Sequence, residues 1–185
     1  QYRTSLISEA VTRGLNPNTT LKDSGVQWIG QIPEEWEVSK LKYVLRVNGR
    51  VGFKGYTTAD LVSEGEGAYT IGGKHITNCV LDLSNADYIS WDKYYESPEI
   101  LVKTGDIVMA QRGTLGKAAL IKEDIGPATI NPSLVLLNEI SINNVFLLYY
   151  LLSKPIQEWI GLMNTATAVP IISQNQIDNV PIPVP

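Results

Sequence analysis

Residues 108–120 read VMAQRGTLGKAAL, and this stretch decides how the middle of the chain folds. Apolar residues lead into QRGTLGK and out of it again, and its two glycines supply turn conformations that residues with a Cβ atom avoid. Two apolar runs joined by a short glycine-containing loop are typical of a β-hairpin. The sequence therefore predicts strands over residues 107–111 and 117–122 with a tight loop between them.

The spacing of the loop residues tests one chemistry directly. A phosphate-binding P-loop needs the pattern G-x-x-x-x-G-K-[ST]. Aligning Gly116 and Lys117 with that pattern would require glycine at Gln111 and a hydroxyl at Ala118, so nucleotide binding by this loop is excluded. Two interpretations stay open with equal weight: a plain turn, and a turn whose tip contacts a ligand.

The composition is that of a globular domain. The chain has 185 residues, 44% of them hydrophobic, which is enough for one domain with its own core. It has no run of 18 apolar residues, so we expect no membrane span. The single cysteine, Cys79, permits no disulfide within the chain, and the single histidine, His75, permits no histidine-rich metal site. Both features fit the reducing cytoplasm, where we expect the protein to reside.

The charge is unevenly distributed along the chain. The net charge of −4 argues by itself against nucleic acid as a partner. However, residues 38–80 contain six basic and three acidic residues, and residues 103–122 contain four and one, so each segment has a net charge of +3. Either these cations form a local basic surface, or they alternate with carboxylates over a solvated face; the sequence favours the second arrangement only slightly.

The apolar pattern predicts an α+β fold that is β-rich, with its helices late in the chain. Residues 2–13 form a predicted amphipathic helix ended by Gly14, and residues 15–27 a polar linker. Large apolar groups are expected to clamp this arm onto the domain; they are Trp28, Ile29, Ile32 and Trp36. Strands are predicted within residues 38–47 and over residues 69–72, 79–83, 107–111, 117–122, 128–130 and 133–137.

Helix signals concentrate near the end of the chain. WDKYYES (91–97) predicts a short helix before Pro98, and NNVFLLYYLLS (143–153) a mostly buried one. Pro155 fits the first turn of a further helix. Ser173 and Gln176 have the spacing of a capping box, and the alternate prolines of VPIPVP (180–185) predict an extended end.

No complete catalytic motif occurs in the sequence. Residues 131–134, NPSL, match only the first half of the [DNS]-P-P-[YF] motif of DNA adenine methyltransferases and lack its aromatic platform for a flipped base. Neither G-x-G-x-x-G nor G-x-S-x-G occurs. The carboxylates at residues 34–35 and 64–66 look solvated, which leaves a glycosidase-type pair unsupported. We therefore expect a binding module without catalytic activity and without a cofactor.

Segments in a fixed order resemble one known family. KDSGVQWIGQIPEEWEVSKLKY (22–43) resembles the opening of a target-recognition domain in the specificity subunit of type I restriction-modification enzymes. YRTSLISEAVTRGLNPN (2–18) looks like the end of the helical spacer that precedes it. The middle and the close of the domain are resembled by LVKTGDIVMAQRGTLGKAALI (101–121), ATINPSLVLL (128–137), LLYYLLSKPIQ (147–157) and ISQNQIDNVPIPVP (172–185).

The resemblance implies the end of a helical spacer plus a linker at residues 1–21 and a target-recognition domain at residues 22–185. It implies a non-catalytic domain that binds double-stranded DNA at one half of a bipartite site. The protein partners would be the modification (methyltransferase) subunits, which hold S-adenosylmethionine, and through them the restriction subunit. The apolar stripe of residues 2–13 would be buried against spacer helices or these subunits, with no role for a membrane.

The resemblance also divides the candidate DNA contacts. A segment shared by a family cannot encode a specificity that differs between its members, so QRGTLGK is expected to be scaffold or to hold phosphate. Base reading is expected from NGRVGFKGYTT (48–58) and GGKHITN (72–78), whose side chains can bond to base edges. The candidate base-side residues are Arg50, Lys54, Tyr56, Lys74, His75 and Asn78, and the candidate phosphate contacts are Arg112, Thr114 and Lys117. A structural or solvated role is an equal alternative for these residues, and the structural role is favoured for His75.

Two other functions stay open. A protein-interaction module that serves assembly only would capture a partner helix and would not bind DNA at low salt. A small hydrolase would have a deep pocket holding a carboxylic acid with a raised pKa. A continuous positive groove that includes residues 50–56, 74–78 and 112–117 would favour DNA over both.

Overall fold

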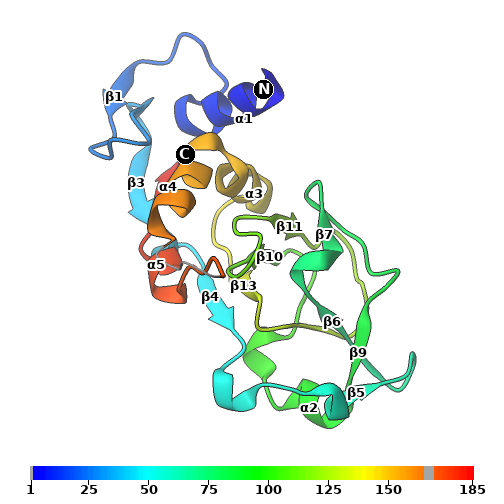
Figure 1. Ribbon diagram of the computed structural model, residues 1–185. Helices are drawn as coiled ribbons and strands as arrows, with labels where there is room; N and C mark the ends of the chain where they lie inside the picture. The colour runs from blue at the N-terminus through cyan, green and yellow to red at the C-terminus, as the bar shows by residue number, and fades with distance from the viewer. Residues whose placement is uncertain (1, 165–168) are drawn as a thin grey trace.

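The computed structural model describes residues 2–164 and 169–185, without the side chains of residues 2–4 and 53. In Figure 1 the helices α1, α3 and α4 and both chain ends lie at one end of the molecule, and α2 with a small sheet lies at the other. The central sheet, which contains β10 and β13, lies between them. No helix in the described ranges is both long and apolar enough to cross a membrane.

The central sheet contains the predicted hairpin. Its strand order is β11-β10-β13-β4, and all neighbouring strands are antiparallel. Ile107 pairs with Leu120 and Met109 with Ala118, which leaves residues 111–117 as the hairpin loop and confirms the prediction. The four strands are β4 (Arg46–Gly49), β10 (Ile107–Ala110), β11 (Ala118–Leu120) and β13 (Leu134–Asn138).

The central strands are apolar throughout because both faces of the sheet are covered. Successive side chains of a strand point to opposite faces. In β10, Ile107 and Met109 belong to the core beneath the helices, whereas Val108 and Ala110 belong to a second core shared with the other sheet. All four residues are buried, so β10 lacks the polar alternation of a half-exposed strand.

The second sheet has the order β12-β6-β9-β5, with β12 parallel to β6 and the other pairs antiparallel. Its strands are β5 (Leu61–Val62), β6 (Gly67–Ile71), β9 (Asp87–Ser90) and β12 (Ala128–Ile130). The predicted helix after β9 is present as α2 (Trp91–Tyr95). A separate hairpin consists of β7 (Ile76–Thr77) and β8 (Val80–Leu81). The chain also contains short 3-10 helices of one turn each: η1 (Leu41–Tyr43), η2 (Gly52–Lys54), η3 (Thr58–Asp60), η4 (Gly73–His75) and η5 (Pro98–Ile100).

The late helices begin where the sequence predicts. The helices are α3 (Asn144–Leu152), α4 (Lys154–Met163) and α5 (Gln174–Asp178). The side chain of Asn143 caps α3, Pro155 lies in the first turn of α4, and Ser173 and Gln176 form the capping box of α5. Tyr150 is fully buried and donates its hydroxyl to the carbonyl of Pro181 at 2.6 Å. This bond ties α3 to β14 (Pro181–Val184), which pairs with β3 (Glu37–Lys40).

The N-terminal segment packs on these helices. α1 (Tyr2–Arg13) precedes Gly14, whose φ of 78° lies in the left-handed region. Val11 enters the core beneath the helices, and the Trp36 ring meets Phe146 edge-on at 5.8 Å between centroids. Trp36 is buried with Ile29 and Ile32, so the predicted clamp is confirmed. The segment predicted as a linker contains β1 (Leu21–Asp23), which pairs with β2 (Gln31–Pro33).

The sequence pattern does not predict five of the short strands, namely β1, β2, β5, β7 and β9. Each has two to four residues, too few for a period to be seen. Their pairing depends on neighbours in the fold, as when β5 pairs antiparallel with β9, with Leu61 opposite Ile89.

Candidate nucleic-acid interface

The loop between β10 and β11, residues 111–117, is held in place by the side chain of Gln157 from α4. Gly113 and Gly116 have φ values of 77° and 76°, which only glycine adopts freely. The Gln157 side chain donates to the Gly116 carbonyl at 3.2 Å and to the Leu151 carbonyl at 2.7 Å. A Cβ atom on Gly116 would lie 2.6 Å from Oε1 of Gln157. The helical layer therefore fixes the backbone of this loop.

Two further segments anchor the same loop. Gln111 donates from its side chain to the carbonyls of Pro132 and Leu134, both at 3.3 Å. The N–H of Gly113 donates to the Pro170 carbonyl at 2.9 Å, and the N–H of Ile172 donates to the Gln111 carbonyl at 2.9 Å. The loop is thus a rigid element that joins residues 131–134 to residues 170–172.

The three candidate phosphate contacts project from this rigid loop. Arg112, Thr114 and Lys117 are all exposed. Within the described ranges their side chains have no hydrogen-bond or ion-pair partner. The backbone that carries these two cations is already ordered, so a contact with an anion costs side-chain entropy but little backbone entropy.

The β7–β8 hairpin lies beside the same loop. Residues 76–79 and Lys117 line one depression of about 310 Å³, together with Ala118 and Leu152. Figure 1 shows β7 next to β11. Asn78 is exposed in the two-residue turn of the hairpin, with no partner for its side chain among the described residues. The fold therefore brings Asn78 and Lys117 together from positions 39 residues apart.

The Asn-Pro-Ser segment that partly matches a methyltransferase motif is a structural turn. Oδ1 of Asn131 accepts from the N–H of Ser133 at 2.9 Å and from its hydroxyl at 2.5 Å. The Asn131 amide lies against Gly72, where a Cβ atom would be 2.5 Å from its Nδ2. This turn connects the second sheet to the central one and locates residues 72–78 beside the β10–β11 loop.

His75 is buried, whereas its neighbour in the sequence, Lys74, is exposed. The Nδ1 of His75 accepts from the Gly72 N–H at 2.9 Å and its Nε2 lies 3.3 Å from the Asn85 carbonyl. A neutral ring protonated on Nε2 satisfies both bonds, and burial lowers the pKa of His75. Two hydrogen bonds hold the ring inside the fold, an environment that fits the structural role favoured for His75. Lys74 is exposed and pairs with Asp87 at 3.0 Å.

Arg50 is buried in the second core and is not placed as a base reader. Its guanidinium donates to the Ile130 carbonyl at 3.2 Å, to the Lys54 carbonyl at 3.3 Å and to the Thr129 hydroxyl at 3.1 Å. Burial lowers its pKa, and the guanidinium carbon lies 5.3 Å from the ring centre of Tyr56. Its donors serve the packing of residues 50–56 against β12.

Lys54 and Tyr56 also have internal partners. Lys54 donates to the Glu96 carbonyl at 3.0 Å and lies 3.9 Å from the Glu99 carboxylate. Tyr56 is half-buried against the cluster of Ala68, Ile89 and Tyr94, and this burial raises its pKa. Residues 50–56 therefore contribute no free cation, and the continuous positive groove through residues 50–56, 74–78 and 112–117 does not form.

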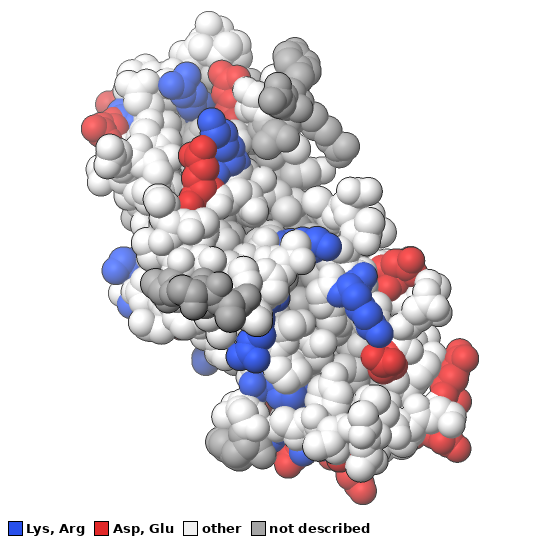
Figure 2. Space-filling view, viewed as in Figure 1, with Lys and Arg blue, Asp and Glu red and all other residues white. Residues whose placement is uncertain are grey.

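The distribution of charge follows the fold. Residues 51–100 contain eight acidic and three basic residues, a net charge of −5, while the rest of the chain has a net charge of +1. In Figure 2 the blue groups lie mostly across the middle of the molecule, and red groups gather at the end where Figure 1 places β5, β9 and α2. The exposed cations Arg112 and Lys117 belong to the less acidic part, which suits contact with a polyanion.

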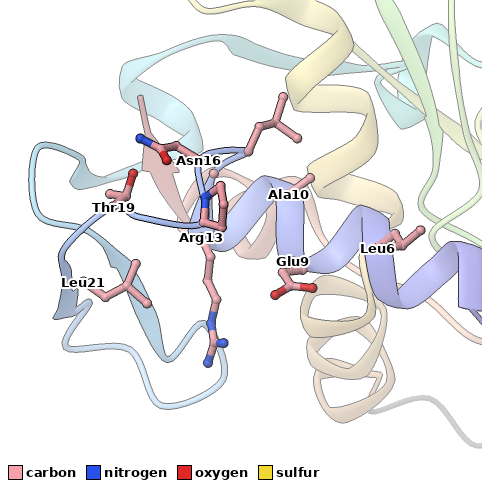
Figure 3. Close-up of a pocket in the computed structure, with 10 residues that line it drawn as sticks. Leu6, Glu9, Ala10, Arg13, Asn16, Thr19 and Leu21 are labelled. Atoms are coloured by element: carbon pink, nitrogen blue, oxygen red, sulfur yellow. The ribbon is translucent and has the colours of Figure 1, made fainter.

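The cavities give little support to hydrolysis. The cavity in Figure 3, of about 410 Å³, lies between α1 and residues 14–21, and Glu9 is its one carboxylate among Leu6, Arg13 and neutral residues. A second cavity, of about 330 Å³, contains Asp106, whose pKa is raised by burial although it accepts from the Lys103 N–H at 2.8 Å.

The other carboxylates of the second cavity are already paired. Glu99 lies near Lys54, and Glu139 forms an ion pair with Arg46. A raised pKa at Asp106 is one feature expected of a hydrolase. No second carboxylate in this cavity is free to act with it.

Thr77 and Val80 flank the turn of the β7–β8 hairpin and are exposed with Asn78. Thr77 lies within the predicted base-reading loop 72–78 but is not singled out there, and Val80 lies outside that loop. Residues 76–81, ITNCVL, are a weak sequence signal for this hairpin. Apolar residues lie on both sides of Asn78, a residue type that tolerates the left-handed conformation of a tight turn.

Comparison with known proteins identifies this arrangement. A family model described as "Type I restriction modification DNA specificity domain" matches residues 33–185. The type I restriction enzyme MjaVIII specificity subunit of Methanocaldococcus jannaschii is 28% identical over 190 residues, covering 97% of this chain and 42% of the relative. The chain thus spans about two fifths of the length of this relative.

Solved structures show the same fold. The HsdS subunit from Thermoanaerobacter tengcongensis matches with a TM-score of 0.65 and 17% identity, over 100% of this chain and 39% of that one. A chain from a study of complex assembly and conformational transition of the type I R-M system matches with a TM-score of 0.65 and 18% identity, over 100% and 40%. At these identities the likeness concerns the fold alone. Because the family model covers most of the residues, the chain belongs to the type I restriction-modification DNA specificity domain family.

Proposed function

We propose that this chain recognises one half of a bipartite site in double-stranded DNA and directs the modification subunits, and through them the restriction subunit, to that site. The domain itself carries out no catalysis and works in the cytoplasm. Residues 22–185 form the recognition domain, and residues 1–21 are the end of a helical spacer with its linker.

One observation carries this proposal beyond family membership. Arg112 and Lys117 are exposed, and their side chains have no hydrogen-bond or ion-pair partner among the described residues. They project from a loop whose backbone is fixed by Gln157, Gln111 and the Gly113–Pro170 bond. Phosphate contacts position a protein on a duplex without reading its sequence. We therefore assign phosphate binding to Arg112 and Lys117, with Thr114 between them as a hydroxyl donor.

The test is a titration of fluorescent duplexes of different sequence, repeated at several salt concentrations. Arg112→Ala and Lys117→Ala should each lower the affinity for all duplexes alike. Each should also make the slope of log K against log salt about 0.9 less negative, because one phosphate contact is lost. Lys22→Ala is the matched control, since Lys22 is an exposed cation of β1 outside the proposed interface. If the control weakens binding as much as the two loop variants do, the assignment of phosphate contacts to the loop is wrong.

The alternative of an assembly module has its own supporting feature. An apolar groove of about 760 Å³ runs beside α1, lined by residues that include Leu6, Leu15, Phe146 and Tyr149. Leu6 is 49% exposed there, so α3 covers only part of the apolar stripe of α1. If the chain binds a partner helix but no duplex at low salt, assembly replaces DNA recognition as its function.

A further inference from the structure

The β7–β8 hairpin has a rigid base and a free tip. Ile76 is 1% exposed and packs in the core between the two sheets, with Leu81 against the same core. Asn78 and Cys79 have φ values of 51° and 65°, as in a type I′ turn. Because Asn tolerates this region better than most residues, the turn is formed without glycine.

The side chains at the tip are available to a ligand. Thr77, Asn78 and Val80 are exposed, Val80 at 61%. Thr77 and Asn78 have no side-chain hydrogen bond within the described parts of the chain. A hydroxyl, a carboxamide and a branched apolar group therefore project together from one short ribbon.

The surroundings of the tip favour an anionic polymer on one side. Lys117 lines the same depression as Thr77 and Asn78. Residues 76–81 carry no charge, and the carboxylate that follows them, Asp82, accepts from the Ser84 N–H at 3.0 Å. A duplex whose phosphate meets Lys117 would therefore bring a groove next to this uncharged tip.

We propose that the β7–β8 hairpin reads base edges in the major groove; this rests on the proposed function. The major groove admits a two-stranded β-ribbon, an Asn side chain bonds bidentately to N6 and N7 of adenine, and an apolar group contacts the thymine methyl. Asn78 reads an adenine, and Val80 packs on the methyl of a thymine beside it. Lys117 fixes the register through phosphate, so one footprint contains the positioning and the reading contacts.

The experiment is a selection of bound sites from random duplexes at low salt, with wild type and three variants. Asn78→Gly keeps the left-handed turn and removes the carboxamide, and Asn78→Asp keeps the turn and removes its donor. Asn18→Gly is the control, at an exposed Asn in the arm after α1. Equal melting temperatures of the four proteins establish that the hairpin variants are folded.

We expect wild type to prefer adenine at one position about 5- to 150-fold, the range that a bidentate contact gives. Asn78→Gly should lose that preference, Asn78→Asp should shift it toward cytosine, and Asn18→Gly should retain it. A wild-type preference that survives in Asn78→Gly overturns the hairpin assignment and leaves the proposed function in place. Wild-type binding without any preference overturns the proposed function as well, because the chain then recognises no site. A wild-type chain that binds no duplex at all overturns the proposed function and the assignment with it.

Discussion

At the scale of single residues, the same residue type has opposite environments in neighbouring loops. Arg50 is 6% exposed and bonded to two carbonyls and a hydroxyl, whereas Arg112 is exposed and unpaired among the described residues. Nothing in the local sequence separates them, because both lie beside glycine in a polar loop. Burial decides whether a guanidinium packs the core or meets a ligand.

Arg50→Ala should therefore destabilise the fold rather than alter DNA preference. The substitution leaves the Thr129 hydroxyl and the Ile130 carbonyl without their buried partner, a loss of about 1–3 kcal/mol. Denaturant unfolding of wild type and variant measures this change, with site selection on the folded variant as the second readout. A variant of unchanged stability that loses preference at one base pair would restore Arg50 as a reader.

The buried ring of His75 should make stability depend on pH. Its folded pKa is lowered below the ordinary value of 6.5, so the unfolded chain binds the extra proton first. Stability from this group is complete above pH 6.5 and falls as pH drops from 6.5 toward the folded pKa. His75→Gln can keep both hydrogen bonds without titrating, so urea unfolding at several pH values should show a smaller loss for the variant. Parallel curves for the two proteins would exclude His75 as the source.

At the scale of elements, the two glycines of the β10–β11 loop have the same backbone conformation but different surroundings. Gly113 and Gly116 have nearly equal positive φ, yet space around Gly113 is open within 4 Å and Gly116 is covered by Gln157. Both positions require glycine for their backbone conformation. At Gly116 there is also no room for a Cβ atom, because the Gln157 side chain occupies that space.

Gly113→Ala should cost about 1–2 kcal/mol of stability from backbone strain alone. Gly116→Ala should cost more, because its methyl group also displaces the Gln157 amide that bonds the loop carbonyl. Thermal unfolding of the two variants compares them directly. Equal losses would mean that Gln157 moves aside freely and does not hold the loop.

At the scale of the whole molecule, the two four-stranded sheets differ in how deeply they are buried. The central sheet is covered on both faces, and every residue of β10 and β11 is buried. The second sheet has shorter or half-exposed strands, such as β5 and β9, and the β7–β8 hairpin has two residues per strand. The β7–β8 hairpin therefore projects from the less buried part of the molecule, and the β10–β11 loop from the more buried part.

Hydrogen exchange should follow this division. Amides of β10 and β13 should exchange only through global unfolding, whereas those of β5, β7 and β8 should exchange by local opening. Exchange followed by NMR at several urea concentrations separates the two, since local opening shows little dependence on urea. Uniform protection across both sheets would show that they unfold as one unit.

The β10–β11 hairpin, the late helices with their caps and the packing of Trp36 could all be predicted from the sequence, which also lacks a complete catalytic motif. These features depend on local periodicity, turn residues and capping spacing, which are visible within about 15 residues. It also contained the family pattern. Which cations are exposed without a partner among the described residues could not be predicted, because the groups that bury Arg50 and pair with Lys54 and Lys74 come from other parts of the chain. The approach of Asn78 to Lys117 could not be predicted either, since strand pairing and sheet packing, and not local sequence, fix which loops meet.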